Sequence, residues 1–328
     1  MKEIKWGVLS VSGHYRLRVS DPIRHVPGMR VSAIASRDSA RAGAAAAEFG
    51  IATAYGSYED LLADKSLDAV YIPLPNHLHL EWIKKSADAG KHILCEKPLT
   101  LNADEAQEAV DYARKKGVLL MEAFMYPCHP QWIRARELIK IGEIGQVTAI
   151  QTHFCYKNTD PQNIRNRPDA GGGAILDIGC YAVSSARFLL QKEPRRVVSI
   201  VDRDPSFTTD RLTSAVVDFG DTQQTFFVGT QTFPQQTVTA FGTSGTLTVN
   251  LPFNAFPDVP LSVTVQTGIG TREIQTGPAD QYGLMFQAFS DAVRSGGESP
   301  TPPEDAIANM KVLDALFASE SSGGWATV

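Results

Sequence analysis

The two side chains best suited to move a proton to or from an oxygen atom are Lys97 and Tyr181. Lys97 follows an apolar run at 93–95 and precedes Pro98, which biases it towards extended or turn backbone. This places the lysine at the carboxyl end of a strand, where open α/β sheets bind their ligands. A tyrosine phenol can protonate a carbonyl when a nearby cation lowers its pKa, and Lys97 is the candidate cation. The alternatives are a solvated turn lysine and a half-buried packing tyrosine.

A glycine-rich motif, GGGAILDIGCY, ends at Tyr181 and adds a carboxylate to the candidate site. Three successive glycines allow the backbone to approach a ligand closely. Asp177 and Tyr181 are four positions apart, so a helix would present both side chains on one face.

The first apolar run, Ile4–Leu9, leads into a loop that could hold the pyrophosphate of a dinucleotide. Such loops use glycines so that the backbone can approach the phosphates at a helix N-terminus. Here serines occupy the first two glycine positions, a glycine comes one place later and a tyrosine stands at the third. A plain strand-to-helix turn is the alternative. The predicted cofactor contacts of this loop are Ser10, Ser12, Gly13, His14 and Tyr15.

The end of the second strand discriminates between the two nicotinamide cofactors. An NAD enzyme usually places a carboxylate there to hold the ribose hydroxyls, whereas a 2′-phosphate favours a hydroxyl and a guanidinium. Ser36 and Arg37 supply the latter pair, so NADP(H) is favoured over NAD(H). The alternative is that Asp38 binds the ribose and Arg37 is a surface residue.

Polar residues also follow the next two strands of the predicted sheet. Asn76 can hydrogen-bond a cofactor, and His79 lies in the first turn of the following helix. Zinc binding by His77 and His79 is disfavoured, because no Cys or carboxylate partner lies at ligand spacing, and no metal is predicted. The predicted cofactor contacts here are Pro73, Asn76, His79, Glu96 and Lys97.

Composition narrows the class of protein. The chain has 328 residues, 43% hydrophobic and 20% charged, with a formal net charge of −5. No basic block favours nucleic acid, no apolar run looks long enough to span a bilayer, and no signal peptide is visible. Four cysteines without Cys-x-x-Cys spacing fit free thiols in a reducing compartment. We therefore expect a cytoplasmic protein with a small-molecule ligand.

Two halves of different character predict two domains. Up to about residue 124, strands alternate with helices, which predicts a doubly wound parallel sheet. Residues 125–328 are rich in closely spaced Thr- and Val-containing strands, which predict an α+β domain with a large, mostly antiparallel open sheet. The expected domains are thus 1–124 and 125–328, with the helix at 303–319 packing back on the first.

Three ordered motifs resemble those of the Gfo/Idh/MocA family of oxidoreductases. They are Glu96-Lys97-Pro98, Pro75-Asn76-x-x-His79 and the glycine motif with Asp177 and Tyr181. Within the family, MEAFMY at 121–126 is most similar to the branch of NADP-dependent D-xylose dehydrogenases, dimeric trans-dihydrodiol dehydrogenases and glucose–fructose oxidoreductase.

The resemblance implies a Rossmann domain, a second domain whose open sheet forms a homodimer face, and three catalytic residues. Lys97 and Tyr181 would act at the reacting carbinol, and Asp177 would hold a substrate hydroxyl. The Lys97-Pro98 bond is a candidate for the cis form. Two departures from the pattern stand out: Tyr15 could crowd the pyrophosphate, and Pro127 replaces a common arginine.

The leading hypothesis is an NADP(H)-dependent oxidoreductase of a sugar or related polyhydroxylated ring. Lys97, Asp177 and Tyr181 would contact the substrate, and Arg165 or Arg167 could reach its rim. The alternatives are a trans-dihydrodiol dehydrogenase-like activity, a non-catalytic dinucleotide-binding sensor and, last, a metal hydrolase using His77, His79 and Asp177.

Overall fold

The computed structural model describes residues 2–328, which divide into two compact units. Unit 1 comprises the chain up to Met125 together with Tyr282–Ile307. Unit 2 comprises Tyr126–Gln281 and Ala308–Val328.

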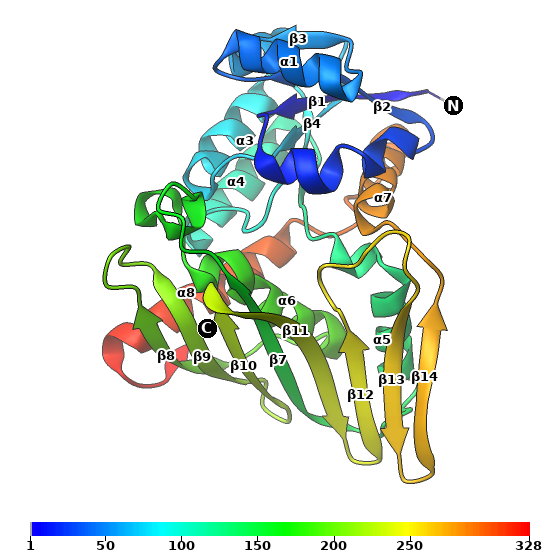
Figure 1. The fold of residues 1–328 in the computed structure, drawn as a ribbon, viewed down its shortest axis with the longest axis vertical. Helices are drawn as coiled ribbons and strands as arrows, with labels where there is room; N and C mark the ends of the chain where they lie inside the picture. The colour runs from blue at the N-terminus through cyan, green and yellow to red at the C-terminus, as the bar shows by residue number, and fades with distance from the viewer. Residues whose placement is uncertain (1) are drawn as a thin grey trace. The chain divides into compact units, whose positions relative to one another are not determined.

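Unit 1 contains a six-stranded sheet in which neighbouring strands are parallel (Figure 1). The strand order β3-β2-β1-β4-β5-β6 reverses its direction between β1 and β4, and doubly wound sheets bind ligands at such a reversal. The predicted Rossmann sheet is confirmed. The strands are β1 (Ile4–Leu9), β2 (Met29–Ala35), β3 (Thr53–Tyr55), β4 (Ala69–Ile72), β5 (His92–Cys95) and β6 (Leu120–Glu122).

Side-chain caps begin three of the four helices that connect these strands, the exception being the helix His79–Asp88. Asp38 accepts a hydrogen bond from the Arg41 backbone N–H, and Asn102 accepts one from the Glu105 N–H. Such caps satisfy N–H groups that the first turn of a helix leaves unpaired. The helices are α1 (Ser39–Phe49), α2 (Tyr58–Ala63), α3 (His79–Asp88) and α4 (Ala103–Lys116).

Helix α7 (Gln281–Ser295) belongs with unit 1 because of its aromatic residues. The rings of Phe286 and Phe289 pack 4.9 Å and 5.6 Å from the ring of Trp6, which lies in β1. Residues 282–307 thus pack with the first part of the chain, whereas the sequence placed 282–302 in the second domain and expected only the helix at 303–319 to pack back on the first. Of the final helix, α8 (Glu304–Ser322), only the first turn falls in unit 1. The domain boundary at 124/125 itself stays a prediction.

Unit 2 is built on a nine-stranded sheet of order β14-β13-β12-β11-β7-β10-β9-β8-β15. Its neighbouring strands are antiparallel except for the parallel pair β7 and β10, so the predicted mostly antiparallel sheet is confirmed. The strands are β7 (Val147–Lys157), β8 (Arg196–Arg203), β9 (Asp210–Asp218), β10 (Gln223–Gly229), β11 (Gln231–Gly242), β12 (Gly245–Asn250), β13 (Leu261–Thr267), β14 (Gly270–Thr276) and β15 (Ala326–Thr327).

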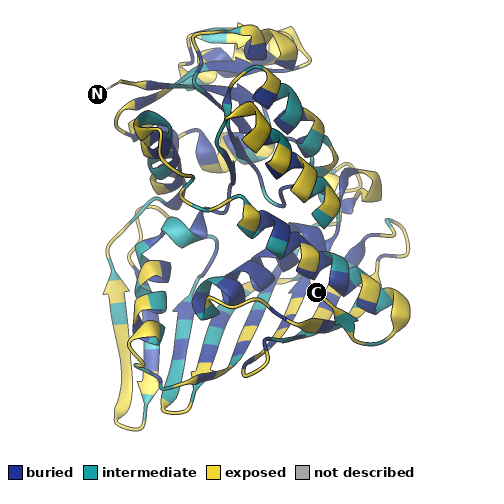
Figure 2. Cartoon of the chain, turned by 180° about the vertical axis from the view of Figure 1, so that it is seen from behind, coloured by how far each residue is buried: buried dark blue, intermediate teal, exposed yellow. Residues whose placement is uncertain are grey.

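Helices cover only one face of this sheet. Figure 2 shows α5 (Pro130–Lys140), α6 (Cys180–Leu190) and the later part of α8 on that face. The stretch Pro168–Leu190, which includes α6, is long and apolar enough to cross a membrane, contrary to the sequence expectation, but 89% of its most apolar window is buried. Its burial identifies it as a core segment of unit 2. All four cysteines are free.

The other face of the sheet carries large apolar side chains. Register pairs Phe227 of β10 with Ser214 of β9, and Ser214 with Ile200 of β8, so Phe227 and Ile200 share a face. Phe227 is 38% exposed, and its ring stacks on His153 of β7. Ile200 is 78% exposed. We call this the open face of the sheet.

Candidate active site

Lys97 lies where the sequence predicted it, directly after β5 in unit 1, and its bond to Pro98 is cis. Two buried side chains hold this turn. The Leu99 N–H donates to Glu122 Oε1 at 2.8 Å. The ring nitrogens of His79 lie 3.0 Å from the Pro98 carbonyl oxygen and 2.8 Å from that of Leu74.

The observed contacts of His79 differ from the predicted cofactor contact. Its side chain is fully buried and both ring nitrogens face backbone carbonyls. Burial lowers the pKa of His79, although the two carbonyls oppose the shift. His79 therefore positions the loops that follow β4 and β5, rather than contacting a cofactor as predicted.

Glu96 forms a polar cluster beside Lys97. Its Oε1 accepts a hydrogen bond from the Tyr71 hydroxyl at 2.6 Å and lies 3.3 Å from His14 Nε2. Burial raises the pKa of Glu96, but His14, Tyr71 and Lys97 together outweigh burial and hold it at about 2. The carboxylate is consequently ionised at neutral pH, and no sequence motif pointed to its partner Tyr71.

The loop after β1 contains one residue, Ser10, in a backbone conformation typical of glycine. Ser10 has a φ of 133°, a conformation that favours glycine. Ser12 Oγ accepts from the Tyr15 N–H at 3.0 Å, so it caps the following turn. The Tyr15 ring is 1% exposed and packs edge-on against Phe49, with burial raising its pKa. The Tyr15 side chain is therefore part of the core, which corrects the prediction of a cofactor contact that crowds the phosphates.

At the end of β2, Asp38 is committed to capping α1 through the Arg41 N–H, and Ser36 Oγ accepts from the Asp38 N–H at 3.2 Å. Arg37 is exposed. The guanidinium of Arg41 donates to the Val11 carbonyl oxygen at 2.6 Å, which brings a second arginine to the loop after β1. Sequence reasoning missed Arg41, although its place one turn after Arg37 was visible.

The remaining predicted contacts of unit 1 lie at the carboxyl end of β4. Pro73 is buried, and Asn76 begins a short 3-10 turn (Asn76–Leu78) with a partly exposed side chain. Both residues therefore lie at the sheet edge where doubly wound folds bind ligands.

In unit 2, Asp177 and Tyr181 lie on one continuous helical stretch that runs from 174 to 190. Its beginning, Ile175–Gly179, is π-helical rather than α-helical, so the wider turn separates the two residues differently from the α-helical spacing predicted. The Tyr181 ring is 6% exposed and packs 5.6 Å from Phe154 and 5.1 Å from Phe253. Aromatic packing therefore holds the phenol.

Asp177 is held by two donors from neighbouring segments. Its Oδ2 accepts from the Tyr156 hydroxyl at 2.6 Å and from Arg165 Nε at 2.8 Å. The Asp177 carboxylate raises the pKa of Arg165, and burial with the same carboxylate raises the pKa of Tyr156, so both remain donors. Arg165 thus contacts Asp177. The guanidinium of Arg167 instead pairs with Asp169 on the surface.

Neighbouring atoms leave no room for a side chain at Gly172 or Gly173. A Cβ on Gly172 would lie 2.5 Å from the Arg165 carbonyl oxygen, and a Cβ on Gly173 would overlap the carboxylate of Asp210. Asp210, at the start of β9, accepts from the Ile175 N–H at 2.5 Å. The sequence showed the glycines but not Asp210, which lies far along the chain.

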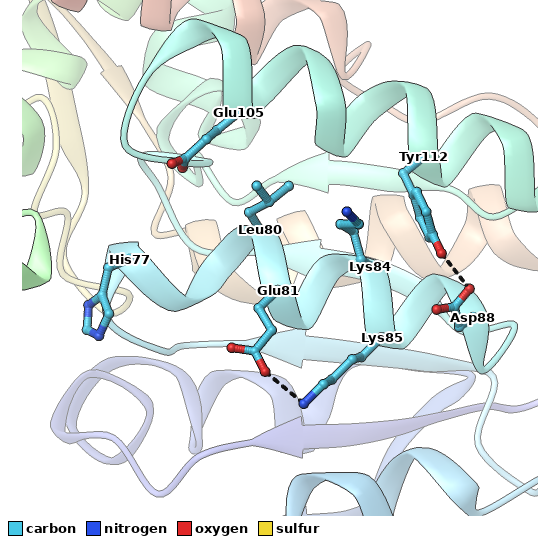
Figure 3. A pocket seen from close by; sticks show the side chains of 8 residues that line it. All are labelled: His77, Leu80, Glu81, Lys84, Lys85, Asp88, Glu105 and Tyr112. Atoms are coloured by element: carbon cyan, nitrogen blue, oxygen red, sulfur yellow. Dashed lines mark hydrogen bonds and ion pairs between the residues drawn. The ribbon is translucent and has the colours of Figure 1, made fainter.

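A shallow groove between α3 and α4 in unit 1 is distinct from these residues (Figure 3). Polar groups in the groove contact one another: Lys85 forms an ion pair with Glu81, and the Tyr112 hydroxyl donates a hydrogen bond to Asp88. His77 lines this groove at one end. Within residues 2–328, no group of three or more His, Cys, Asp or Glu side chains is arranged to hold a metal ion.

Comparison with known proteins shows the family to which the chain belongs. Residues 5–124 match the oxidoreductase family with an NAD-binding Rossmann fold, and residues 132–248 match the GFO/IDH/MocA C-terminal domain. The chain is 42% identical to an uncharacterized oxidoreductase, ORF334, of Rhizobium meliloti, over 100% of both chains. It is 41% identical to D-xylose 1-dehydrogenase (NADP(+)) 2 of Haloferax volcanii, covering 89% of this chain and 90% of that protein.

Among solved structures, the chain is similar to KijD10, a 3-ketoreductase from Actinomadura kijaniata in complex with NADP and TDP-benzene. The TM-score is 0.92 at 29% identity, covering 97% of this chain and 98% of that chain. With both family domains matched in order, the chain belongs to the Gfo/Idh/MocA family and is a nicotinamide-dependent oxidoreductase.

Proposed function

We propose that the protein is an NADP(H)-dependent oxidoreductase that interconverts a carbinol and a carbonyl on a sugar or related polyhydroxylated ring. The observation that carries the proposal is Lys97 at the carboxyl end of β5, next to a Glu96 carboxylate that stays ionised. The xylose dehydrogenase relative supports a sugar substrate, and the NADP complex of KijD10 supports the cofactor. As part of the proposal, we assign a sugar substrate and NADP to this chain as well.

The residues of unit 1 fit a dinucleotide. Ser10 has the backbone conformation of a glycine loop, and Ser12 keeps its hydroxyl hydrogen to donate to a phosphate. Because Asp38 is committed to the α1 cap, Ser36, Arg37 and Arg41 would hold a 2′-phosphate. When bound, the nicotinamide supplies or accepts the hydride.

In the proposed mechanism the chain moves and holds protons. Tyr181 donates a proton to the carbonyl oxygen, or takes it from the hydroxyl in the reverse direction. Lys97 hydrogen-bonds the same oxygen and favours the ionised phenol. Asp177, held by Tyr156 and Arg165, orients a neighbouring substrate hydroxyl.

Turnover with a panel of aldoses, cyclic polyols and dihydrodiols, with NADP and NAD in turn, tests the function. We expect NADP-dependent oxidation of at least one aldose. A protein that binds NADPH by fluorescence titration but oxidises and reduces none of the panel would instead be a dinucleotide sensor. A preference for NAD would contradict the assignment of Ser36 and Arg37.

An Arg37→Ala variant tests cofactor choice separately. Loss of a charge-assisted contact to a phosphate should raise KM for NADP by about 10-fold and leave KM for NAD unchanged. Arg30→Ala is the control, because Arg30 pairs with Glu3 at the other end of β2. An equal effect on both cofactors would remove Arg37 from 2′-phosphate recognition.

We also propose that the open face of the sheet binds a second copy of this chain. Large exposed apolar side chains on this face favour a protein partner, and the same face of two copies can meet across a twofold axis. Light scattering should find a dimer that Phe227→Glu converts to a monomer. Ile269→Glu is the control, because Ile269 is exposed in the turn between β13 and β14. A monomeric wild-type protein would contradict the proposal.

A further inference from the structure

Asp210 is a buried carboxylate that no proposed step uses. It is 2% exposed, and its Oδ2 accepts a hydrogen bond from the Ile175 N–H at 2.5 Å. Ile175 lies in the first turn of the helical stretch that carries Asp177 and Tyr181. The first N–H groups of a helix have no partner within it, so an acceptor from another element fixes where the helix begins.

The local backbone is shaped around this contact. Gly173 has a φ of 116°, and any Cβ there would overlap Asp210 Oδ1. The Gly173 carbonyl oxygen in turn accepts from the Asp177 N–H at 3.1 Å. Asp210 therefore lies against Gly173 and accepts from the Ile175 N–H, which are four and two residues before Asp177 in the chain.

The charged groups around Asp210 do not replace this contact. Arg203 of β8 favours its ionised form, whereas Glu320 of α8 opposes it. Arg203 is itself paired bidentately with Glu320, at 2.7 Å for each hydrogen bond. The hydroxyl of Tyr156, on β7, already donates to Asp177.

We propose that Asp210 is a positioning residue for the oxidoreductase reaction, because it anchors the start of the helix that carries Asp177 and Tyr181. This inference rests on the proposed function, in which those two side chains contact the substrate. A shift of about 1 Å at reacting groups can cost about 100-fold in rate, so a loose helix start should lower kcat. Cofactor binding, assigned to unit 1, should not change.

The test compares Asp210→Ala with Asp204→Ala. Asp204 is the control because it is 8% exposed and its side chain accepts from the Ser206 and Phe207 N–H groups and from Gln231 Nε2, and all three donors lie outside the helix. With a substrate found in the panel, we expect Asp210→Ala to lower kcat by about 10- to 100-fold. Its dissociation constant for NADPH should equal that of the wild type, and Asp204→Ala should keep the wild-type kcat.

Two further variants separate positioning from simple destabilisation. Asp210→Asn keeps an acceptor for the Ile175 N–H and should restore kcat to within about threefold of the wild type. If Asp210→Ala does not fold, Asp210→Val replaces it, since valine suits a strand and has no acceptor. Hydrogen exchange at residues 175–181 should accelerate in the Ala or Val variant only.

Specific results would overturn the inference. They are a wild-type kcat in a folded Asp210→Ala or Asp210→Val protein, an equal loss in Asp204→Ala, or a loss that resides entirely in NADPH affinity. A wild-type protein that turns over nothing would be a different failure, since it would remove the proposed function itself.

Discussion

Glu96 in unit 1 and Asp210 in unit 2 are both buried carboxylates, 9% and 2% exposed, yet they titrate at opposite ends of the acidic to neutral range. The pKa of Glu96 is lowered to about 2, and that of Asp210 is raised to about 7. Burial raises both. Glu96 has a histidine, a phenol and a neighbouring lysine as partners, whereas Asp210 has mainly backbone N–H groups. Charged and hydroxyl partners therefore decide whether a buried carboxylate is ionised.

The two units also differ in which residue type occupies a position of positive φ. Ser10 in unit 1 and Gly173 in unit 2 both have positive φ, at 133° and 116°. Only at Gly173 would a side chain also meet a carboxylate. A serine is thus tolerated in the first loop, whereas the second loop requires glycine.

The largest effect is expected at Gly173. In Gly173→Ala, strain at positive φ adds to overlap with Asp210, so the free energy of unfolding should fall by about 4 kcal/mol. Urea unfolding measures this loss. Gly50→Ala is the control, because Gly50 has a φ of 66° but nothing within 4 Å of a new Cβ. Equal losses in the two variants would show that the overlap does not matter.

Glu96→Gln removes the charge that its partners neutralise. Breaking one member of a buried charged cluster should cost about 3 kcal/mol at pH 7. The folded pKa of Glu96, about 2, lies below its ordinary value of 4.5, so its stabilising contribution is present above pH 4.5 and is lost as the pH falls towards 2. Urea unfolding at pH 7 and pH 3 should therefore show a smaller acid-induced loss in the variant. An equal acid-induced loss would mean that Glu96 is not ionised in the folded protein.

Asp210 should have the opposite pH dependence. Its folded pKa, about 7, lies above the ordinary value of 3.8, so between these values the folded state keeps a proton that the unfolded state releases. The contribution of Asp210 to stability is therefore greatest below pH 4 and falls, by about 4 kcal/mol, as the pH rises to 7. Subtracting the unfolding curve of Asp210→Asn from that of the wild type isolates this slope. A flat difference between pH 4 and pH 7 would contradict the raised pKa.

Ser10→Gly should have the smallest effect. Glycine adopts positive φ without strain, so the variant should gain about 1 kcal/mol in free energy of unfolding. Ser12→Gly, which removes the cap on the Tyr15 N–H, should lose about 1 kcal/mol and serves as its opposite. A destabilised Ser10→Gly protein would show that the serine hydroxyl stabilises the loop.

The spacing of strands and helices along the sequence predicted most of the fold, because that signal is local. Strand β1 has the bounds of the predicted apolar run Ile4–Leu9, and β5 begins one residue before the predicted run at 93–95. Residues 282–302 were misplaced because Phe286 packs against Trp6, which is 280 positions earlier in the chain. No local pattern records such a contact.

The sequence predicted where the candidate side chains lie along the chain, but it did not predict which residues contact them. Lys97 and Asp177 lie where their motifs place them, at the end of β5 and at the start of the helix leading into α6. Their surroundings depend on Tyr71, Tyr156 and Asp210, which come from strands distant in sequence. Tyr15 and His79 were taken for cofactor contacts because a motif position does not reveal whether a side chain points into the core.

The most direct test of the proposed mechanism is a double-mutant cycle on kcat with Lys97→Met, Tyr181→Phe and the combined variant, using a substrate identified in the panel. If the ammonium of unit 1 and the phenol of unit 2 act on one oxygen atom, each single change should lower kcat by about 100- to 1,000-fold. The combined variant should then be no slower than the slower single variant, since the two groups act together. Unchanged turnover in either single variant, or losses that multiply in the combined one, would contradict the mechanism.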